Sequence, residues 1–279
     1  MAVVWTGFAH RTGFGAGGAG CRVGCLVAVK AIRVKMIHLP SIARAAAEAC
    51  ASLLYPPHCE GCATETTAHE YLCGTCREKV KRIQPPFCET CSQPFDGAID
   101  GTFTCANCLD RRFHFDCAVS AYRSRGIVRD LIHRFKYHSD YRLRHPLADW
   151  LAASLSDARI ASRPFDFFVP VPLHATRLRE REFNQAEVLA RLLQKRTGHT
   201  ALDCLRRIRY TTTQTRFDRK ERMENLRNAF ELRKYMSVQG KHLLLIDDVL
   251  TTGSTVDECS RVLRKAGAAS VRVITVARG

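Results

Sequence analysis

One segment, LLLIDDVLTTGST at residues 243–255, constrains the fold of this chain more than any other. Its first four residues form an unbroken apolar run, which is typical of a strand buried on both faces of a parallel sheet. Asp247 and Asp248 follow at the carboxyl end of that strand, where open α/β sheets bind their ligands. Strand patterns alternate with helix patterns from about Cys117 onward. We therefore predict an α/β fold with a doubly wound parallel sheet.

The chain of 279 residues is long enough for this sheet domain and a smaller module before it. Strands are predicted at residues 117–122, 165–173, 243–246 and 271–277, and helices at 41–54, 127–135, 145–155, 183–195 and 256–263. We expect a disordered basic extension at 1–40, a short helix with a cysteine-rich module at 41–115, and the sheet domain at 116–279. Met1 and Met36 are both candidate initiators.

The turn after the two acids indicates a phosphate site. It supplies hydroxyls and backbone N–H groups at the start of a predicted helix, where the helix dipole favours an anion. Adjacent carboxylates can accept hydrogen bonds from a vicinal diol and can hold a water-coordinated Mg²⁺. Together these features predict a site for a ribose 5'-phosphate, and the alternative is an exposed acidic strand end before an ordinary helix. The residues of this turn are Thr251, Thr252, Gly253, Ser254 and Thr255.

The same segment resembles the phosphoribosyl pyrophosphate (PRPP) motif of type I phosphoribosyltransferases. The resemblance implies that Asp247 and Asp248 are the catalytic acids and contact the ribose hydroxyls. It also implies that residues 251–255 wrap the 5'-phosphate, and that Mg²⁺ accompanies PRPP.

Eight of the 14 cysteines form four Cys-x-x-Cys pairs, which predict two structural zinc sites. Two thiolates three residues apart can reach one tetrahedral zinc, and a second pair completes its shell. We expect sequential sites, with a cross-braced pairing and a disulfide scaffold as alternatives. The first predicted site is Cys59, Cys62, Cys73 and Cys76, and the second is Cys88, Cys91, Cys105 and Cys108.

A basic segment, VPVPLHATRLREREFNQA at residues 169–186, is the second candidate ligand element. We expect Pro170 and Pro172 to make a rigid loop after a strand. Arg177, Arg179 and Arg181 then follow at alternate positions, and in a loop they can converge on an anion such as pyrophosphate. The alternative is a solvated basic turn.

These segments in this order resemble the ComF family, over roughly Cys59 to Gly279. The resemblance implies a double zinc ribbon before a type I phosphoribosyltransferase domain. It also implies a pyrophosphate loop made of Pro172, His174, Arg177, Arg179, Arg181, Asn184 and Gln185. Family members usually carry a glycine where this chain has Glu182, so a positive φ there would strain the backbone.

The formal net charge of +16 indicates polyanionic partners. Between Arg177 and Lys234 there are 16 Lys or Arg against 8 Asp or Glu. We interpret Arg219 and Arg222 as part of a basic flap over an anionic ligand or a track for single-stranded DNA. Lys136 is a further candidate contact to the ligand phosphates.

The family resemblance implies a role in single-stranded DNA uptake and handling during natural transformation, together with a site for PRPP or a related phosphoribosyl ligand. The alternative is an active phosphoribosyltransferase that transfers phosphoribose to a nucleobase-like acceptor. No run of about 18 apolar residues exists. We therefore expect a cytoplasmic protein that is not inserted into a membrane and that works with DNA-uptake machinery.

Overall fold

A computed structural model describes residues 56–67, 70–99, 101–210 and 226–279 of the chain. The extension predicted at 1–40, the helix predicted at 41–54, and Arg219 and Arg222 lie outside these residues. The strands are β1 (Ala118–Arg123), β2 (Phe167–Pro170), β3 (Thr200–Ala201), β4 (Leu205–Arg207), β5 (Phe230–Leu232), β6 (His242–Leu250) and β7 (Ser270–Arg278). The α-helices are α2 (Gly74–Lys79), α3 (Ala106–Leu109), α4 (Gly126–Tyr137), α5 (Arg144–Ala152), α6 (Ala158–Ala161), α7 (Ala175–Arg181), α8 (Gln185–Thr197) and α10 (Ser254–Lys265).

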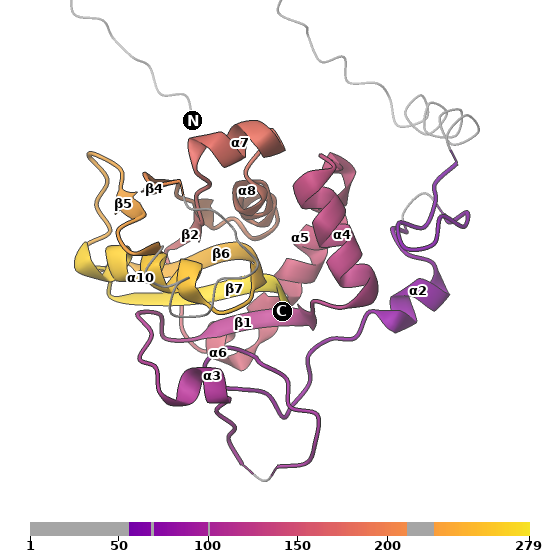
Figure 1. The fold of residues 1–279 in the computed structure, drawn as a ribbon, viewed down its shortest axis with the longest axis horizontal. Coiled ribbons are helices and arrows are strands. Elements are labelled where there is room, and N and C mark those ends of the chain that lie inside the picture. Colours follow the sequence, from indigo (N-terminus) through magenta and orange to yellow (C-terminus); the bar gives the residue numbers. More distant parts are fainter. Residues whose placement is uncertain (1–55, 68–69, 100, 211–225) are drawn as a thin grey trace, which may run out of the picture. The chain divides into compact units, whose positions relative to one another are not determined.

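Five strands form one parallel sheet in the order β1-β7-β6-β2-β3 (Figure 1). The connection from β2 to β3 runs toward one edge of the sheet, and the connection from β6 to β7 runs toward the other. The order therefore reverses between the neighbours β2 and β6. In open α/β sheets the crevice beyond the carboxyl ends of such strands is where ligands bind. The topology thus brings the two segments that follow β2 and β6 to the same place.

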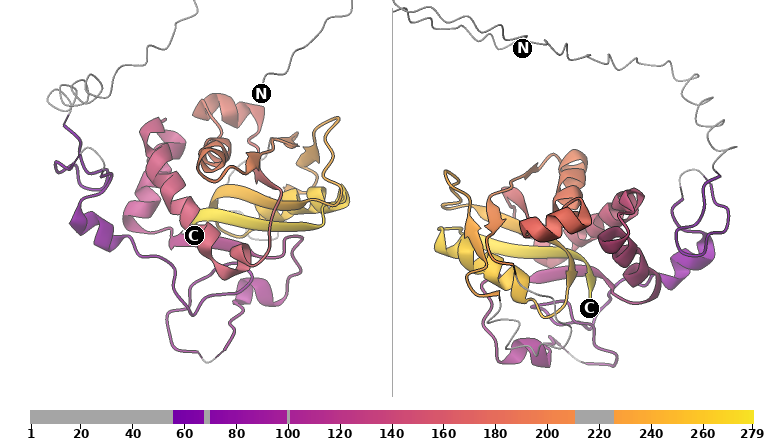
Figure 2. Two further views of the ribbon diagram at one scale, coloured as in Figure 1. Left: turned by 180° about the vertical axis from the view of Figure 1, so that it is seen from behind. Right: turned by 45° about the horizontal axis from the view of Figure 1, so that its top comes forward.

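Alternate residues of the strands face two hydrophobic layers, as expected for a sheet covered on both sides. Leu244 and Ile246 of β6 pack with residues of α4, α5 and α8. Leu243 and Leu245 pack on the opposite face with residues of α10. The arrangement of these helices around the sheet is visible in Figure 2. All four β6 side chains are fully buried, and each such burial stabilises the fold by about 1.5–3 kcal/mol.

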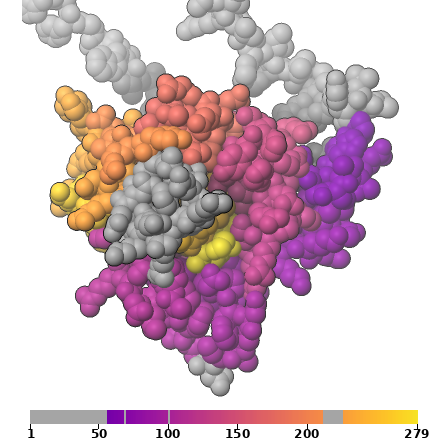
Figure 3. Space-filling model, viewed as in Figure 1, coloured from indigo at the N-terminus to yellow at the C-terminus, as the bar shows by residue number. Residues whose placement is uncertain are grey.

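The second cysteine module, residues 88–108, covers part of the sheet where α10 does not. Its four cysteines are buried and belong to the same hydrophobic layer as Leu243 and Leu245. Its backbone reaches β1 directly, because the Thr90 carbonyl accepts a hydrogen bond of 2.8 Å from the Ala118 amide. In the space-filling view this module lies flush against the sheet domain (Figure 3).

The structure differs from the sequence prediction at three places. Strand β6 continues past the two acids to Leu250, because its residues pair with β7 as far as Arg278. The predicted arginine loop after β2 is instead the helix α7. A small antiparallel hairpin of β4 and β5, which the sequence pattern did not reveal, packs against α10.

Candidate functional site

The two acids of β6 lie in a dense network of charge. Asp248 is buried, and its carboxylate forms an ion pair with Lys136 at the end of α4. The Lys136 Nζ lies 2.7 Å from a carboxylate oxygen of Asp248. Asp247 is partly buried, and its carboxylate accepts a hydrogen bond of 2.9 Å from the Asp248 backbone amide. Lys136 was a candidate ligand contact from sequence, and the structure places it against one of the two acids.

Burial and charged neighbours shift the pKa of Asp247. Burial and the neighbouring Asp248 carboxylate raise the pKa of Asp247 to about 7, and Lys136 opposes the shift. Burial lowers the pKa of Lys136, but the Asp248 and Asp247 carboxylates outweigh that effect and raise the pKa above its ordinary value. Asp247 therefore titrates near neutral pH beside the charged Lys136. Groups with pKa values shifted in this way are typical of ligand-binding or catalytic sites.

The hydroxyl-rich turn follows β6 directly and opens α10. Gly253 has a φ of 79° at the N-cap of α10, a conformation that favours glycine. The Ser254 amide donates to the Thr252 hydroxyl at 3.4 Å, and the two side-chain oxygens are 3.0 Å apart. Ser254 is buried, Thr252 and Thr255 are partly buried, and Thr251 is exposed. The turn therefore combines a helix N-terminus with hydroxyls, as the phosphate prediction requires.

The three predicted arginines lie on a helix, which corrects the expectation of a converging loop. Successive residues of a helix are separated by about 100°, so positions four apart share a face and the position midway between them does not. Arg177 and Arg181 are accordingly partly buried on one face of α7, whereas Arg179 is exposed. Arg177 and Arg181 can therefore approach one ligand from the same face of α7.

The other predicted members of the pyrophosphate segment fix the local backbone. His174 caps α7 by accepting a hydrogen bond from the Thr176 amide at 3.2 Å. Asn184 caps α8, and its side-chain amide also donates to the Val171 carbonyl at 3.0 Å. Pro172 is buried. Gln185 is buried as well, and its amide donates to the Phe135 carbonyl at 3.4 Å. These contacts position α7 and its arginines beside the end of α4.

Arg181 extends toward the charged network from α7. Its guanidinium donates to the Gln185 side-chain oxygen at 3.3 Å and lies 4.9 Å from the Tyr137 ring centroid. Tyr137 is adjacent to Lys136 in α4. The Arg181 charge also lowers the pKa of Asp247. The sheet order brings the segments after β2 and β6 together, and the charge of Arg181 in the first segment acts on Asp247 in β6.

Arg207 of β4 joins the same network, although the sequence reasoning did not single it out. Burial lowers the pKa of Arg207, and the charges of Arg177 and Arg181 add to that effect while Asp247 opposes it. This coupling puts Arg207 near both arginines and the acid. A three-residue strand carries no periodic pattern, so nothing in the sequence distinguishes this arginine from its neighbours.

The eight paired cysteines form two clusters that follow the sequential pairing. The Sγ atoms of each cluster all lie within 4.8 Å of one another, with Cys59, Cys62, Cys73 and Cys76 in one and Cys88, Cys91, Cys105 and Cys108 in the other. The Sγ atoms of Cys62 and Cys73 are 3.7 Å apart, and those of Cys91 and Cys105 are 3.6 Å apart. A tetrahedron with zinc–sulfur bonds of about 2.3 Å has edges of about 3.8 Å, so both clusters fit zinc.

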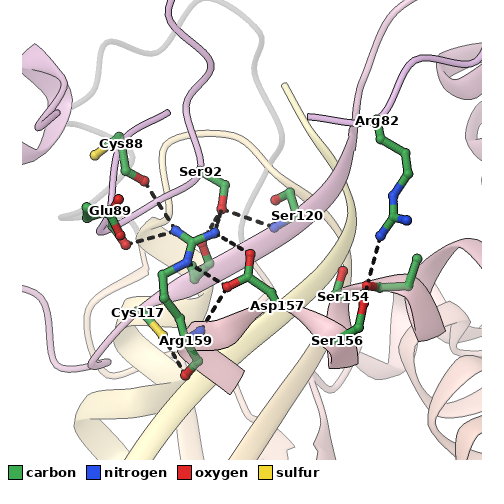
Figure 4. A network of polar contacts seen from close by, with 12 residues as sticks. Arg82, Cys88, Glu89, Ser92, Cys117, Ser120, Ser154, Ser156, Asp157 and Arg159 are labelled. Carbon is green, nitrogen blue, oxygen red and sulfur yellow. Dashed lines mark hydrogen bonds and ion pairs between the residues drawn. The ribbon is translucent and has the colours of Figure 1, made fainter. Parts of the chain in front are cut away.

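Arg159 of α6 holds the second cluster against the sheet domain (Figure 4). Its guanidinium donates to the Glu89 carbonyl at 3.0 Å and to the Ser92 hydroxyl at 3.0 Å. Asp157 holds the guanidinium in place at 2.8 Å. Ser92 also links the cluster to β1, because its hydroxyl donates a hydrogen bond to the Ala118 carbonyl at 2.9 Å. This module is therefore a fixed part of the domain surface.

Comparisons with known proteins match both the cysteine-rich module and the sheet domain. A model of the double zinc ribbon domain matches residues 50–109, and a model of the phosphoribosyl transferase domain matches residues 184–279. Competence protein F of Haemophilus influenzae is 31% identical over 226 residues, which is 79% of this chain and 95% of that protein. DNA utilization protein YhgH of Escherichia coli is 32% identical over 214 residues, 75% of this chain and 91% of that protein.

A solved structure of glutamine PRPP amidotransferase from B. subtilis is 23% identical and covers 47% of this chain and 25% of its own, with a TM-score of 0.31. Among the described residues, no helix has the length and apolar character needed to span a bilayer. The motifs, the parallel sheet and the curated relatives agree, and this chain is a member of the ComF family, with structural zinc ribbons ahead of a phosphoribosyltransferase domain.

Proposed function

We propose that this protein binds PRPP or a related phosphoribosyl ligand at the carboxyl end of β6 and acts in the handling of single-stranded DNA during uptake. The observation that carries the ligand proposal is the meeting of two acids, a hydroxyl-rich helix N-terminus and several cations at the point where the strand order reverses. Each of these groups suits a different part of one ligand.

The ribose would lie against the β6 acids. Asp247 and Asp248 offer carboxylate oxygens that accept hydrogen bonds from the two adjacent ribose hydroxyls. Carboxylate oxygens are also the ligands that Mg²⁺ prefers, usually with several retained waters. We therefore propose that Mg²⁺ enters with the ligand and that Lys136 gives up its contact with Asp248 to reach the ligand phosphates.

The phosphates would occupy the two ends of the site. The 5'-phosphate fits the turn at 251–255, where the amides and hydroxyls of the α10 N-terminus favour an anion. The pyrophosphate requires concentrated positive charge, which Lys136, Arg177, Arg181 and Arg207 supply from three different elements. Neutralising the pyrophosphate is also the main electrostatic task in a phosphoribosyl transfer, so catalysis remains the alternative function.

Isothermal titration calorimetry with PRPP and Mg²⁺ tests the ligand site. Asp247→Asn and Asp248→Asn should each weaken binding by about tenfold or more, because each removes a charged acceptor. Asp149→Asn is the matched control, since Asp149 is an exposed acid on α5 paired only at the surface with Arg196. No binding by the parent protein would refute the proposal. Release of pyrophosphate on adding a nucleobase would establish the catalytic alternative.

The DNA role is supported by the names of the relatives, a competence protein and a DNA utilization protein, and by a groove beside β1. This groove has a volume of about 560 Å³ and is lined by the segment between the two ribbons, by residues 95–97 of the second ribbon, and by the chain from the end of β1 into α4. Its five cations outnumber its one acid, Asp96, which is already paired with Arg123 at 2.5 Å. The cations are Lys79, Lys81, Arg82, Arg123 and Arg125. A phosphate backbone is the ligand class that such a lining favours.

Fluorescence anisotropy with an oligothymidylate over a range of salt concentrations tests the DNA role. Lys79→Glu/Lys81→Glu should weaken binding and reduce the salt slope by about 1.4, from about 0.7 per phosphate contact on a single strand. Lys195→Glu/Lys265→Glu makes the same change of charge on α8 and α10 and should leave the slope near the parent value. If only Arg219→Ala/Arg222→Ala weakens oligothymidylate binding, the DNA contact lies in the basic flap predicted from sequence and not in the groove.

A further inference from the structure

Two arginines join the second zinc ribbon to the phosphate-binding turn. Arg278, on the last strand, donates from one guanidinium nitrogen to the Leu250 carbonyl at 2.9 Å, immediately before the turn. Its other terminal nitrogen lies 3.8 Å from the Cys91 Sγ, a member of the second cysteine cluster. Arg278 is 6% exposed, so this bridge is inside the protein. One side chain therefore contacts both a zinc-ligand sulfur and the backbone of the ligand site.

The charge of a zinc-bound ribbon explains why an arginine can be buried there. Four thiolates around Zn²⁺ leave a net charge of about −2 at the site. A guanidinium in contact with one of those sulfurs is a counter-ion for that charge, and contacts of this kind orient and tune metal ligands. Without the metal-organised thiolates, a cation would be buried beside the Leu250 carbonyl with no equivalent compensation.

Arg111 makes the second connection, three residues after Cys108. Its guanidinium donates to the Thr252 carbonyl at 3.1 Å and approaches the Asp257 carboxylate of α10 to 3.9 Å. It also lies 4.2 Å from the Phe113 ring centroid. That ring is so close to Gly253 that an added Cβ would lie 3.5 Å from it. The segment leaving the second ribbon thus packs directly on the turn.

The first ribbon has a different set of neighbours. Its Glu60 carboxylate and carbonyl accept hydrogen bonds from Arg134 of α4, at 2.6 Å and 2.8 Å. Its buried cysteines belong to the hydrophobic layer on the opposite face of the sheet from α10. The two ribbons are therefore expected to have separable effects on the turn.

We propose that the second zinc ribbon, acting through Arg278 and Arg111, holds the phosphate-binding turn in its ligand-ready conformation. Loss of the second zinc weakens phosphoribosyl-ligand binding, whereas loss of the first leaves the turn intact. Arg278 and Arg111 are positioning residues in this scheme, since Arg278 contacts the Leu250 carbonyl at the base of the turn and Arg111 contacts the Thr252 carbonyl within it. The effect on ligand affinity rests on the proposed function, but the effect on the turn does not.

Hydrogen–deuterium exchange of the full-length, zinc-replete protein tests the proposal without any ligand. Arg278→Gln should speed exchange of the amides at 250–254 by about tenfold or more, because it removes a charge-assisted hydrogen bond from the base of the turn. Arg272→Gln is the matched control: Arg272 is an equally buried arginine of β7 that donates to the Ile160 and Pro164 carbonyls. It should leave exchange at 250–254 near the parent rate while destabilising the domain.

Zinc-ligand variants provide the second comparison, with bound zinc counted by mass spectrometry. Cys91→Ser should speed exchange of the turn, and Cys62→Ser should not. Unchanged exchange at 250–254 in Arg278→Gln, or equal effects from the two cysteine variants, would overturn the proposal. Arg278→Gln keeps all eight cysteines, so the test stands even if Cys91→Ser does not fold. If the parent fails to bind PRPP, the proposed function is lost but the exchange results still decide this inference.

Discussion

Replacing Asp247 by asparagine should stabilise the protein increasingly as the pH rises. The folded pKa of about 7 lies above the ordinary value of 3.8, so the folded state binds more protons between those values. Stability therefore falls as the pH rises through that window and as the carboxyl ionises next to Asp248. Asparagine cannot ionise, and it retains an oxygen to accept the Asp248 amide hydrogen bond of 2.9 Å. The variant escapes the cost that the parent incurs.

The size of the effect follows from the same two pKa values. The full difference between them corresponds to about 4 kcal/mol, and the part that develops between pH 6 and pH 8 is about 1.4 kcal/mol. For a domain of this size that free energy corresponds to about 3–5 °C in Tm. Keeping the pH at 6 or above also limits competition between protons and zinc for the cysteines.

The assay is thermal unfolding of parent and variant at pH 6, 7 and 8 with zinc present. The gap in Tm should widen by about 3–5 °C toward pH 8. Asp149→Asn, on an exposed acid, should give a gap that does not change with pH. A gap for Asp247→Asn that stays constant or narrows as the pH rises would refute the reasoning. If Asp247→Asn is more stable than the parent but binds PRPP more weakly, Asp247 serves ligand binding at a cost in stability.

Two further changes test local features of the fold. Lys136→Met leaves the buried Asp248 carboxylate without its partner and should lower stability by about 3 kcal/mol, measured as Tm, and adding Asp248→Asn should recover most of the loss. Persistent destabilisation in the double variant would mean that the lysine acts through packing. Glu182→Gly should raise stability by about 0.5–1 kcal/mol, because Glu182 has a φ of 65°. A lower Tm in that variant would show that the glutamate side chain compensates for its backbone strain.

The parts of the fold that could be predicted were those encoded by residues close together in the sequence. The apolar run before Asp247 predicted a central strand, and the four cysteine pairs predicted both clusters. The arginine segment misled, because Pro172 and His174 signal a break and alternate arginines suggest an extended chain. The break is real, but the chain resumes at once as α7, with His174 as its cap.

Other features depended on contacts that no local pattern encodes. The hairpin of β4 and β5 joins two three-residue strands that are distant in sequence, and Arg207 reaches the site only because of that pairing. The contacts of Arg159 and Arg278 with the second ribbon join residues separated by 67 and 187 positions. Their partners could be named only once the chain was folded.

The fastening of the second ribbon to β1 has a consequence for how such chains can diverge. A ribbon that shares its interior with the sheet is not a portable module, because a ribbon imported from elsewhere would leave the β1 surface uncovered. Residues on the two sides of that seam must then change in concert. Among ComF-family relatives, replacement of Ser92 should coincide with replacement of Arg159, its partner at 3.0 Å. The first ribbon, held on α4, is free to vary without regard to that pair.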